Sequence, residues 1–211
     1  MPDDTNFIAG NNTPGRNEAN NLFPVFLKLE QLSLLIVGGG YVGMEKLQAV
    51  VQNAPKTPIK LVATVISDEI KALAAAYNNI TLIEKPYAPG DIDEADIVIA
   101  ALNDPQVSTQ VSRDAKQKGK LVNVADKPEL CDFYLGSVVR KGSVKIAIST
   151  NGKSPTIAKR LKEIISDLLP DELEQLLNQM QAVRNNIKGD FEEKVRRLNA
   201  LTQSLVEKNN F

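Results

Sequence analysis

The stretch LLIVGGGYVGMEK, from Leu34 to Lys46, decides how this chain is interpreted. A short apolar run, typical of a buried strand, leads directly into three glycines and then into a helical pattern. Gly38, Gly40 and Gly43 fit the spacing G-x-G-x-x-G between that strand and that helix, which is the context that indicates dinucleotide binding. The first glycine permits a tight turn, the second lets a pyrophosphate approach, and the third brings helix against strand. The alternative is a glycine-rich turn without a ligand.

Apolar runs and helical patterns alternate on both sides of this motif. The runs are continuous rather than alternating, which is typical of parallel strands covered by helices on both faces. We therefore predict an α/β fold with a Rossmann-type parallel sheet. The expected strands are Leu34 to Val37, Leu61 to Ile66, Ile80 to Ile83, Ile97 to Ala101 and Leu121 to Val124, and the expected helices are Val42 to Gln52, Asp68 to Asn78 and Pro105 to Lys118.

The pattern changes after Asp126. Two short strands are expected from Phe133 to Val139 and from Val144 to Ser149, with a turn at Arg140, Lys141 and Gly142. Ser154 and Pro155 then suit the N-cap and the first position of a helix. That helix and two more behind it are amphipathic. The apolar face of the first consists of Ile157, Leu161, Ile164, Ile165 and Leu168.

Composition limits the chemistry. The 211 residues contain 25 Lys and Arg against 26 Asp and Glu, so no global basic field attracts nucleic acid or an anionic membrane. Cys131 is the only cysteine and histidine is absent, so we predict no disulfide and no metal site. Any catalysis must then use carboxylates, hydroxyls, lysines or a cofactor. Neither a membrane span nor a signal-peptide pattern is found, and we expect a cytoplasmic protein.

A dinucleotide fold also needs an acid near the end of its second strand, where it accepts from the ribose. We expect that strand to end at Ser67, which makes Asp68 the candidate, although Asp68 is equally suited to cap the next helix. No arginine stands nearby to receive a 2′-phosphate, so NAD is favoured over NADP. Ala101 to Asp104 should lie near the cofactor at the carboxyl edge of the sheet, or form a polar loop without a ligand.

Two functional classes remain open from the residues. A short-chain reductase is excluded, because none of the 4 tyrosines has a lysine four positions later. One class is an enzyme that transfers a hydride through the nicotinamide. The other is a regulatory protein that only senses NAD.

Five separated segments resemble a known family. LFPVFLKLE, GGGYVGMEK, AALNDPQV, VNVADKPELCDF and IAISTNGKSPTIAK occur in the order seen in the precorrin-2 dehydrogenase and sirohydrochlorin ferrochelatase family. The resemblance extends from about Leu22 to Pro170. It implies NAD-dependent oxidation of precorrin-2, a tetrapyrrole, to sirohydrochlorin in sirohaem biosynthesis. In some members Fe2+ insertion follows, and the enzyme is a homodimer.

With the resemblance, the chain divides into four regions. Residues 1–20 are expected to form a disordered tail, and residues 21–130 an NAD-binding Rossmann domain. Residues 131–153 would supply dimerisation strands, and residues 154–211 a helical domain. The family often has glycine where Asn151 stands and arginine where Lys159 stands.

The resemblance also implies functional residues. Its shared catalytic carboxylate falls on Asp126, which from the residues alone is either a base that takes a proton as the hydride leaves or an Asx-type turn ahead of Pro128. From the residues alone, the cations near the turns of the second part are either solvated or bind substrate carboxylates, and we expect the second role for only one or two of them: Arg140, Lys141, Lys153, Lys159 and Arg160. The cofactor contacts that the resemblance implies are Gly38, Gly39, Gly40, Tyr41, Val42, Leu102, Asn103 and Asp104. The glycine spacing and the end of the second strand add Gly43, Ser67 and Asp68. The expected substrate contacts are Asn123, Ser149, Asn151, Lys153 and Ser154.

Overall fold

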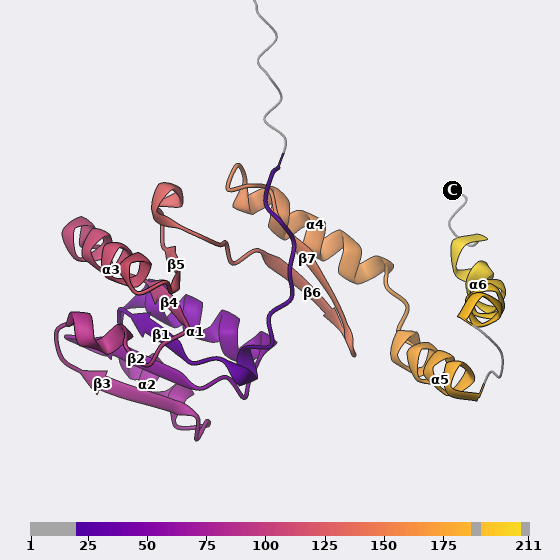
Figure 1. Ribbon diagram of the computed structural model, residues 1–211, viewed down its shortest axis with the longest axis horizontal. Coiled ribbons are helices and arrows are strands. Elements are labelled where there is room, and N and C mark those ends of the chain that lie inside the picture. Colours follow the sequence, from indigo (N-terminus) through magenta and orange to yellow (C-terminus); the bar gives the residue numbers. More distant parts are fainter. Residues whose placement is uncertain (1–19, 187–190, 208–211) are drawn as a thin grey trace, which may run out of the picture.

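The computed structural model describes residues 20–186 and 191–207 (Figure 1). The predicted tail over residues 1–20 therefore lies almost wholly outside the described residues. A five-stranded sheet with helices on both faces forms the first part of the chain. A two-stranded hairpin and three helices form the second part.

The sheet consists of β1 (Leu34–Val37), β2 (Ile59–Ala63), β3 (Ile80–Glu84), β4 (Ile97–Ala100) and β5 (Leu121–Val124). Its order is β3-β2-β1-β4-β5, and every neighbouring pair is parallel. The predicted Rossmann-type sheet is confirmed. The strand order reverses between β1 and β4, and ligands of such sheets bind at the carboxyl ends of the strands at this switch point.

Helices cover the two faces of the sheet. Leu34 and Ile36 of β1 join one core, under α1 (Tyr41–Asn53) and α2 (Asp68–Ala74). Leu35 and Val37 point the other way, into a second core under α3 (Pro105–Gln117) and the short helix η2 (Pro89–Ile92). All four β1 residues are buried, and each such side chain contributes about 1.5–3 kcal/mol. β1 therefore holds the glycine loop on a rigid base.

The second part begins beyond the short helix η3 (Pro128–Leu130). The hairpin comprises β6 (Ser137–Lys141) and β7 (Val144–Ile148), which pair antiparallel. It packs on α4 (Pro155–Leu168), and α5 (Leu173–Asn186) and α6 (Phe191–Glu207) follow. A short helix, η1 (Leu29–Gln31), precedes the sheet.

The hairpin differs from its prediction at both ends. β6 starts at Ser137 rather than Phe133, because the segment before it is bonded to the edge of the sheet: the Asp132 N–H donates to the Val122 carbonyl at 2.8 Å. The loop is Gly142 and Ser143, with Gly142 at a φ of 55°. Arg140 and Lys141, predicted as turn residues, are therefore strand residues.

β2 is shorter than predicted. It ends at Ala63, and Ser67 caps α2, because its hydroxyl accepts from the Ile70 N–H at 3.4 Å. Asp68 consequently lies in the first turn of α2 instead of directly behind a strand. Asp68 was the predicted alternative for the N-cap of this helix, but the capping residue is Ser67.

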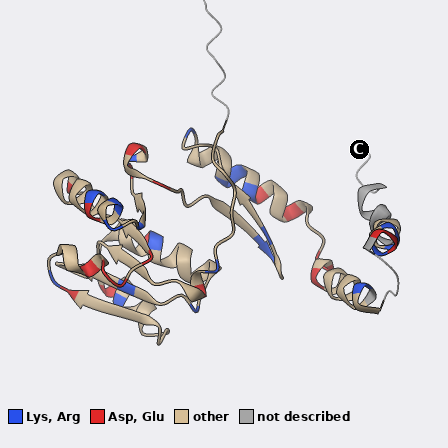
Figure 2. Ribbon diagram, viewed as in Figure 1, with Lys and Arg blue, Asp and Glu red and all other residues tan. Residues whose placement is uncertain are grey.

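The outer face of α4 is apolar and exposed. Ile164 is 55% exposed and Leu168 is 70% exposed, and Ile157 and Leu161 extend the same stripe toward the start of the helix. Charges of both signs are interspersed over the two parts of the chain (Figure 2). Among the described helices, none is long and apolar enough to cross a membrane.

Candidate functional site

The glycine loop has the geometry that its spacing predicted. Gly38 follows β1 at a φ of 128°, and a Cβ at this position would overlap the Ala101 carbonyl. A Cβ on Gly43 would overlap the Gly38 carbonyl, so Gly43 lets α1 approach the loop. A Cβ on Gly39 would overlap the Val65 carbonyl. At these three positions glycine is required by close contacts within the protein and not by a ligand.

Gly40 is different. Apart from its chain neighbours, no residue that the structure describes has an atom within 4 Å of a Cβ at this position. Gly40 is the N-cap of α1, and no side chain caps this helix end. The first intrahelical bond runs from the Met44 N–H to the Gly40 carbonyl at 2.9 Å, which leaves the N–H groups of Tyr41, Val42 and Gly43 without a partner inside the helix. Together with the helix dipole, these donors form an anion-binding site.

A cavity of about 440 Å³ opens above this helix end, at the carboxyl edge of the sheet. This volume lies within the usual range for ligand pockets. Eight predicted cofactor residues line it: Gly38, Gly39, Gly40, Tyr41, Val42, Leu102, Asn103 and Asp104. The loop donors, the open space at Gly40 and the cavity together fit a dinucleotide.

Two groups of lining residues were missed from the sequence. Thr64 and Val65 follow β2, and Pro86 and Tyr87 follow β3. The carboxyl-edge rule that nominated Ala101 to Asp104 applies to them equally and would have found them. Val107 and Gln110 of α3 also line the cavity, and no local signal marks them.

The predicted ribose acid is not at the cavity. Ser67 and Asp68 are not among its lining residues, because β2 already ends at Ala63 and these two residues form the start of α2. Thr64 and Val65 occupy the position behind the strand. Asp104 lines the cavity, but its Oδ1 accepts from the N–H groups of Gln106 at 2.8 Å and Val107 at 3.2 Å, so it caps α3.

Asp126 lies just behind β5, in a turn closed by a hydrogen bond from the Lys127 N–H to the Val124 carbonyl at 3.3 Å. Its φ of 58° is unusual for a residue other than glycine. Its carboxylate is exposed, and within the described chain no hydrogen bond or ion pair reaches it. The Asx-turn alternative therefore has no bond to support it, and the carboxylate is available to a ligand.

The Asp126 turn is joined to the cavity wall. The Ala125 N–H donates to the Ala100 carbonyl of β4 at 2.9 Å. Lys127 Nζ donates to the Pro105 carbonyl, at the start of α3, at 3.3 Å. Asp126 thus stands beside the β4–α3 segment without lining the cavity itself.

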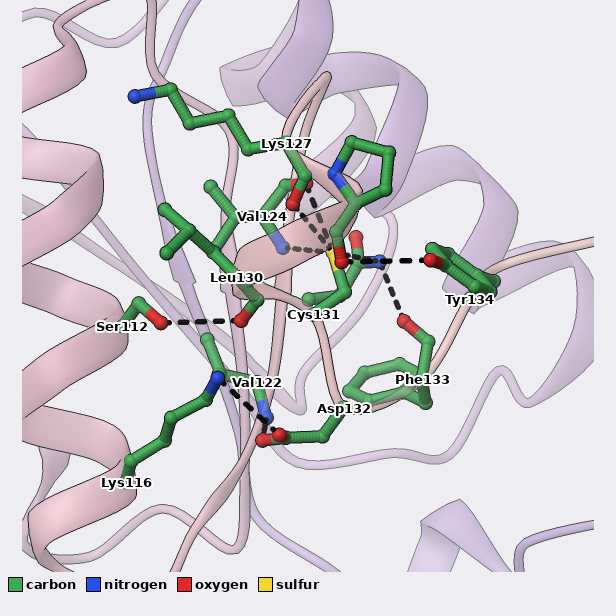
Figure 3. Close-up of polar contacts among 12 residues, drawn as sticks. Ser112, Lys116, Val122, Val124, Lys127, Leu130, Cys131, Asp132, Phe133 and Tyr134 are labelled. Carbon is green, nitrogen blue, oxygen red and sulfur yellow. Dashed lines mark hydrogen bonds and ion pairs between the residues drawn. The ribbon is translucent and has the colours of Figure 1, made fainter. Parts of the chain in front are cut away.

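A network around Cys131 holds both ends of this turn (Figure 3). Cys131 Sγ lies 3.1 Å from the Val124 N, 3.2 Å from the Val124 carbonyl oxygen and 3.3 Å from the Lys127 carbonyl oxygen. Burial raises the pKa of the Cys131 thiol, which keeps the thiol protonated as a donor at neutral pH. The strained conformation of Asp126 is therefore fixed by its surroundings.

Asn123, predicted as a substrate contact, belongs to the same network. It is 6% exposed, and its amide donates to the Phe133 carbonyl at 2.8 Å. The amide nitrogen of Asn123 is therefore engaged within the chain, and its contact with a substrate stays a prediction. Its role is to fasten the segment after Asp126 to β5.

The segment TNGKSP forms a tight turn before α4. Asn151 and Gly152 have φ values of 54° and 74°, and the Lys153 N–H donates to the Thr150 carbonyl at 3.0 Å. The family's frequent glycine at the position of Asn151 fits this left-handed conformation, which asparagine also tolerates. The Ser154 hydroxyl caps α4 by accepting from the Ile157 N–H at 3.2 Å, as predicted.

The basic residues separate into two groups. Arg140 donates to the Gln52 carbonyl, Lys141 pairs with Asp171, and Arg160 pairs with Glu163. Lys153 and Lys159 have no such partner in the part of the chain that the structure describes. Whether those two bind substrate carboxylates stays a prediction. Neither they nor Ser149 and Asn151 line the cavity.

Comparisons with known proteins agree with this geometry. The family model "Putative NAD(P)-binding" matches residues 25–137, and the model "Sirohaem biosynthesis protein central" matches residues 141–168. A siroheme synthase of Nitrosomonas europaea is 30% identical over 168 residues, which are 80% of this chain and 35% of that protein. A siroheme synthase of Psychrobacter sp. (strain PRwf-1) is 36% identical over 169 residues, 80% of this chain and 34% of that protein.

The chain thus spans about a third of the length of these relatives. Among solved structures, SirC, a precorrin-2 dehydrogenase, superposes with a TM-score of 0.68 at 24% sequence identity. The match covers 85% of this chain and 89% of that one. It shows that the two proteins share the fold, including the hairpin-and-helix part.

Proposed function

The chain belongs to the NAD(P)-binding family that its residues 25–137 match, and we propose that it is an NAD-dependent precorrin-2 dehydrogenase of sirohaem biosynthesis. The observation that carries the proposal is the uncapped start of α1, which opens into the cavity at the switch point of the sheet. The matches to siroheme synthases support it over an NAD-sensing regulator, since they extend across both parts of the chain.

The residues divide the work as follows. NAD supplies the hydride acceptor when bound. The N–H groups at the start of α1 hold its pyrophosphate, and the β4–α3 segment contacts the nucleotide. Asp126 accepts the proton that leaves precorrin-2 as the hydride departs. Lys153 and Lys159 attract the substrate carboxylates, and Ser149 and Asn151 lie on the edge of the tetrapyrrole site.

Fe2+ insertion is a further proposed step, with iron as a substrate. Metal entry displaces pyrrole protons from sirohydrochlorin. Asp126 is a suitable acceptor for them, so one carboxylate would serve both reactions.

Turnover of precorrin-2 tests the function. Purified protein mixed with precorrin-2 and NAD+ is expected to produce NADH and sirohydrochlorin in equal amounts, followed by absorbance. A heat-unfolded sample is the control. Binding of NAD+ without turnover would contradict the proposed enzyme activity and favour the NAD-sensing regulatory protein.

We further propose that the active form is a homodimer with a shared cleft. Within one chain, the cavity, the Asp126 turn and the TNGKSP turn do not form one enclosed pocket. The exposed stripe on α4, Ile157, Leu161, Ile164 and Leu168, offers an apolar surface for a second copy.

An aspartate in this stripe is expected to separate the dimer. Ile164→Asp would place a charge in the interface, which is costly to bury, while Ile164 is already exposed in the single chain. Light scattering should give twice the monomer mass for the wild type and the monomer mass for the variant, which should also lose turnover. Lys162→Asp, on the polar side of α4, is the matched control and should stay dimeric. A wild-type monomer with full activity would contradict the shared cleft.

A further inference from the structure

The hairpin carries a pair of cations that it cannot neutralise itself. Arg140 of β6 lies directly opposite Lys145 of β7 in the strand register. Like charges in directly opposed positions destabilise a hairpin, and neither strand contains an acidic residue. Because side chains alternate along a strand, both point away from the face of Val139, which is buried against α4. Such a pair needs a partner outside the hairpin.

The partner is the carboxyl end of α1. Arg140 donates to the Gln52 carbonyl, and Lys145 Nζ donates to the Asn53 carbonyl at 2.6 Å. Gln52 and Asn53 are the last two residues of α1, where carbonyls lack intrahelical donors and the helix dipole is negative. The last turn of α1 has no basic residue of its own. The hairpin therefore supplies the cations that this helix end lacks.

α1 is consequently bound at both ends to parts of the site. Its start holds the glycine loop, and its end holds the hairpin, which lies beside α1 in Figure 1. The helix has 13 residues and is therefore a rod of roughly 20 Å. From Lys145, β7 reaches Ser149 in roughly 13 Å of extended chain. The contact thus fixes where the TNGKSP turn stands relative to the cofactor cavity.

The tip of the hairpin is held separately. Ser143 donates to Glu174 of α5 through its N–H at 2.6 Å and through its hydroxyl at 2.8 Å. Lys141 pairs with Asp171 just before α5. The hairpin is thus a bridge between α1 and the C-terminal helices, and the cation pair is its attachment to the Rossmann part.

We propose that Arg140 and Lys145 are positioning residues that set the distance between the bound tetrapyrrole and the nicotinamide. The effect on the reaction rests on the proposed function, whereas the position of the hairpin rests on the contacts of Arg140 and Lys145 with α1. Neither residue is assigned to the substrate, because both are occupied by α1. A misplacement of about 1 Å between reacting groups can slow a reaction on the order of 100-fold, so the attachment is expected to act on kcat.

The test replaces both cations by methionine, an unbranched side chain that keeps most of the aliphatic part and removes the charge and the donors. In Arg140→Met/Lys145→Met, kcat for NADH formation is expected to fall roughly 10- to 100-fold, with the NAD+ dissociation constant within about twofold of wild type. The exchange Arg140→Lys/Lys145→Arg should restore kcat. Lys56→Met is the matched control, because Lys56 is an exposed cation just beyond α1 and is expected to leave kcat unchanged.

A second measurement tests the geometry without any substrate. Spin labels on cysteines introduced at Glu69 and Lys162, both exposed, report the distance between α2 and α4. Cys131→Ser removes the native thiol, and an excess of unlabelled chain removes signals between subunits. The distance distribution is expected to be narrow in the parent and broad in the methionine variant.

The outcomes separate the two proposals. An unchanged distance distribution, or wild-type kcat in the methionine variant of an active enzyme, would overturn the positioning role. Loss of NAD+ binding parallel to the loss of kcat, or failure of the exchanged pair to restore it, would overturn it too. A wild type without turnover would overturn the proposed function, while the distance measurement would still decide whether Arg140 and Lys145 dock the hairpin.

Discussion

Asp126→Ala is expected to lower kcat for precorrin-2 oxidation by roughly 100- to 10,000-fold, the usual contribution of a positioned general base. NAD+ should still bind, because Asp126 does not line the cofactor cavity. The chain contains no histidine that could replace it.

The backbone of Asp126 complicates this variant, and further substitutions separate strain from chemistry. A φ of 58° is less favourable for alanine than for aspartate, so Asp126→Ala should also have a slightly lower free energy of unfolding than the wild type. Asp126→Asn keeps the shape and tolerates this conformation, but it cannot act as a base. Asp126→Gly relaxes the strain and should be stabilised by about 1 kcal/mol or less. All three should be equally inactive if the carboxylate is the base.

NADH absorbance at saturating NAD+ measures the oxidation, and thermal unfolding measures the fold. If one carboxylate serves both steps, the three variants should also fail to insert Fe2+ into supplied sirohydrochlorin. Retained insertion with lost oxidation would assign separate groups to the two reactions. Oxidation at the wild-type rate in any of these variants would remove Asp126 from the mechanism.

The sheet and its glycine loop could be predicted because their signals are local. β1 and β5 have the bounds expected from the sequence, since strands buried on both faces appear as unbroken apolar runs. The separate roles of Gly38, Gly40 and Gly43 follow from the spacing of one strand, one turn and one helix, and the structure has this spacing.

The errors arise where a distant residue ends an element. The apolar run through Val65 and Ile66 continues beyond Ala63, but Ser67 caps α2 and the Ile66 N–H donates to Glu84 at 3.3 Å. Asp68 therefore lies at the start of α2 and not directly behind a strand. Glu84 lies 18 positions away from Ile66, so no local pattern contains this bond.

The second part was harder for the same reason. The amide of Asn123 donates to the Phe133 carbonyl, ten positions later, and its motif did not indicate this contact. Arg140 resembled a turn cation, yet its acceptor is Gln52, 88 positions earlier. The hydrogen-bond partner of a polar side chain depends on the tertiary fold. The sequence shows only the type of the residue, so these partners could not be predicted from it.

Gly40→Asp is expected to raise the NAD+ dissociation constant at least about 100-fold while the chain still folds. The side chain has room, because within the described ranges only the chain neighbours of Gly40 come within 4 Å of a Cβ at this position, and the φ of −95° suits any residue. An aspartate at this N-cap would accept from the free N–H groups of α1 and occupy the donors that the pyrophosphate needs. Its charge would also repel the phosphates, by about 4 kcal/mol at 4 Å in an effective dielectric of 20.

Two controls isolate this effect. Gly40→Ala adds only a methyl group and should weaken binding far less than the aspartate. Gly43→Ala should instead destabilise the fold, because its Cβ would overlap the Gly38 carbonyl. Titration with NAD+ together with thermal unfolding distinguishes these variants. Titration with NADP+ tests the cofactor preference: the wild type should prefer NAD+, since none of the described residues that line the cavity is an arginine that could receive a 2′-phosphate. Tight NAD+ binding by Gly40→Asp would mean that the pyrophosphate does not lie at the start of α1. Equal affinity of the wild type for the two cofactors would mean that other residues accept the 2′-phosphate.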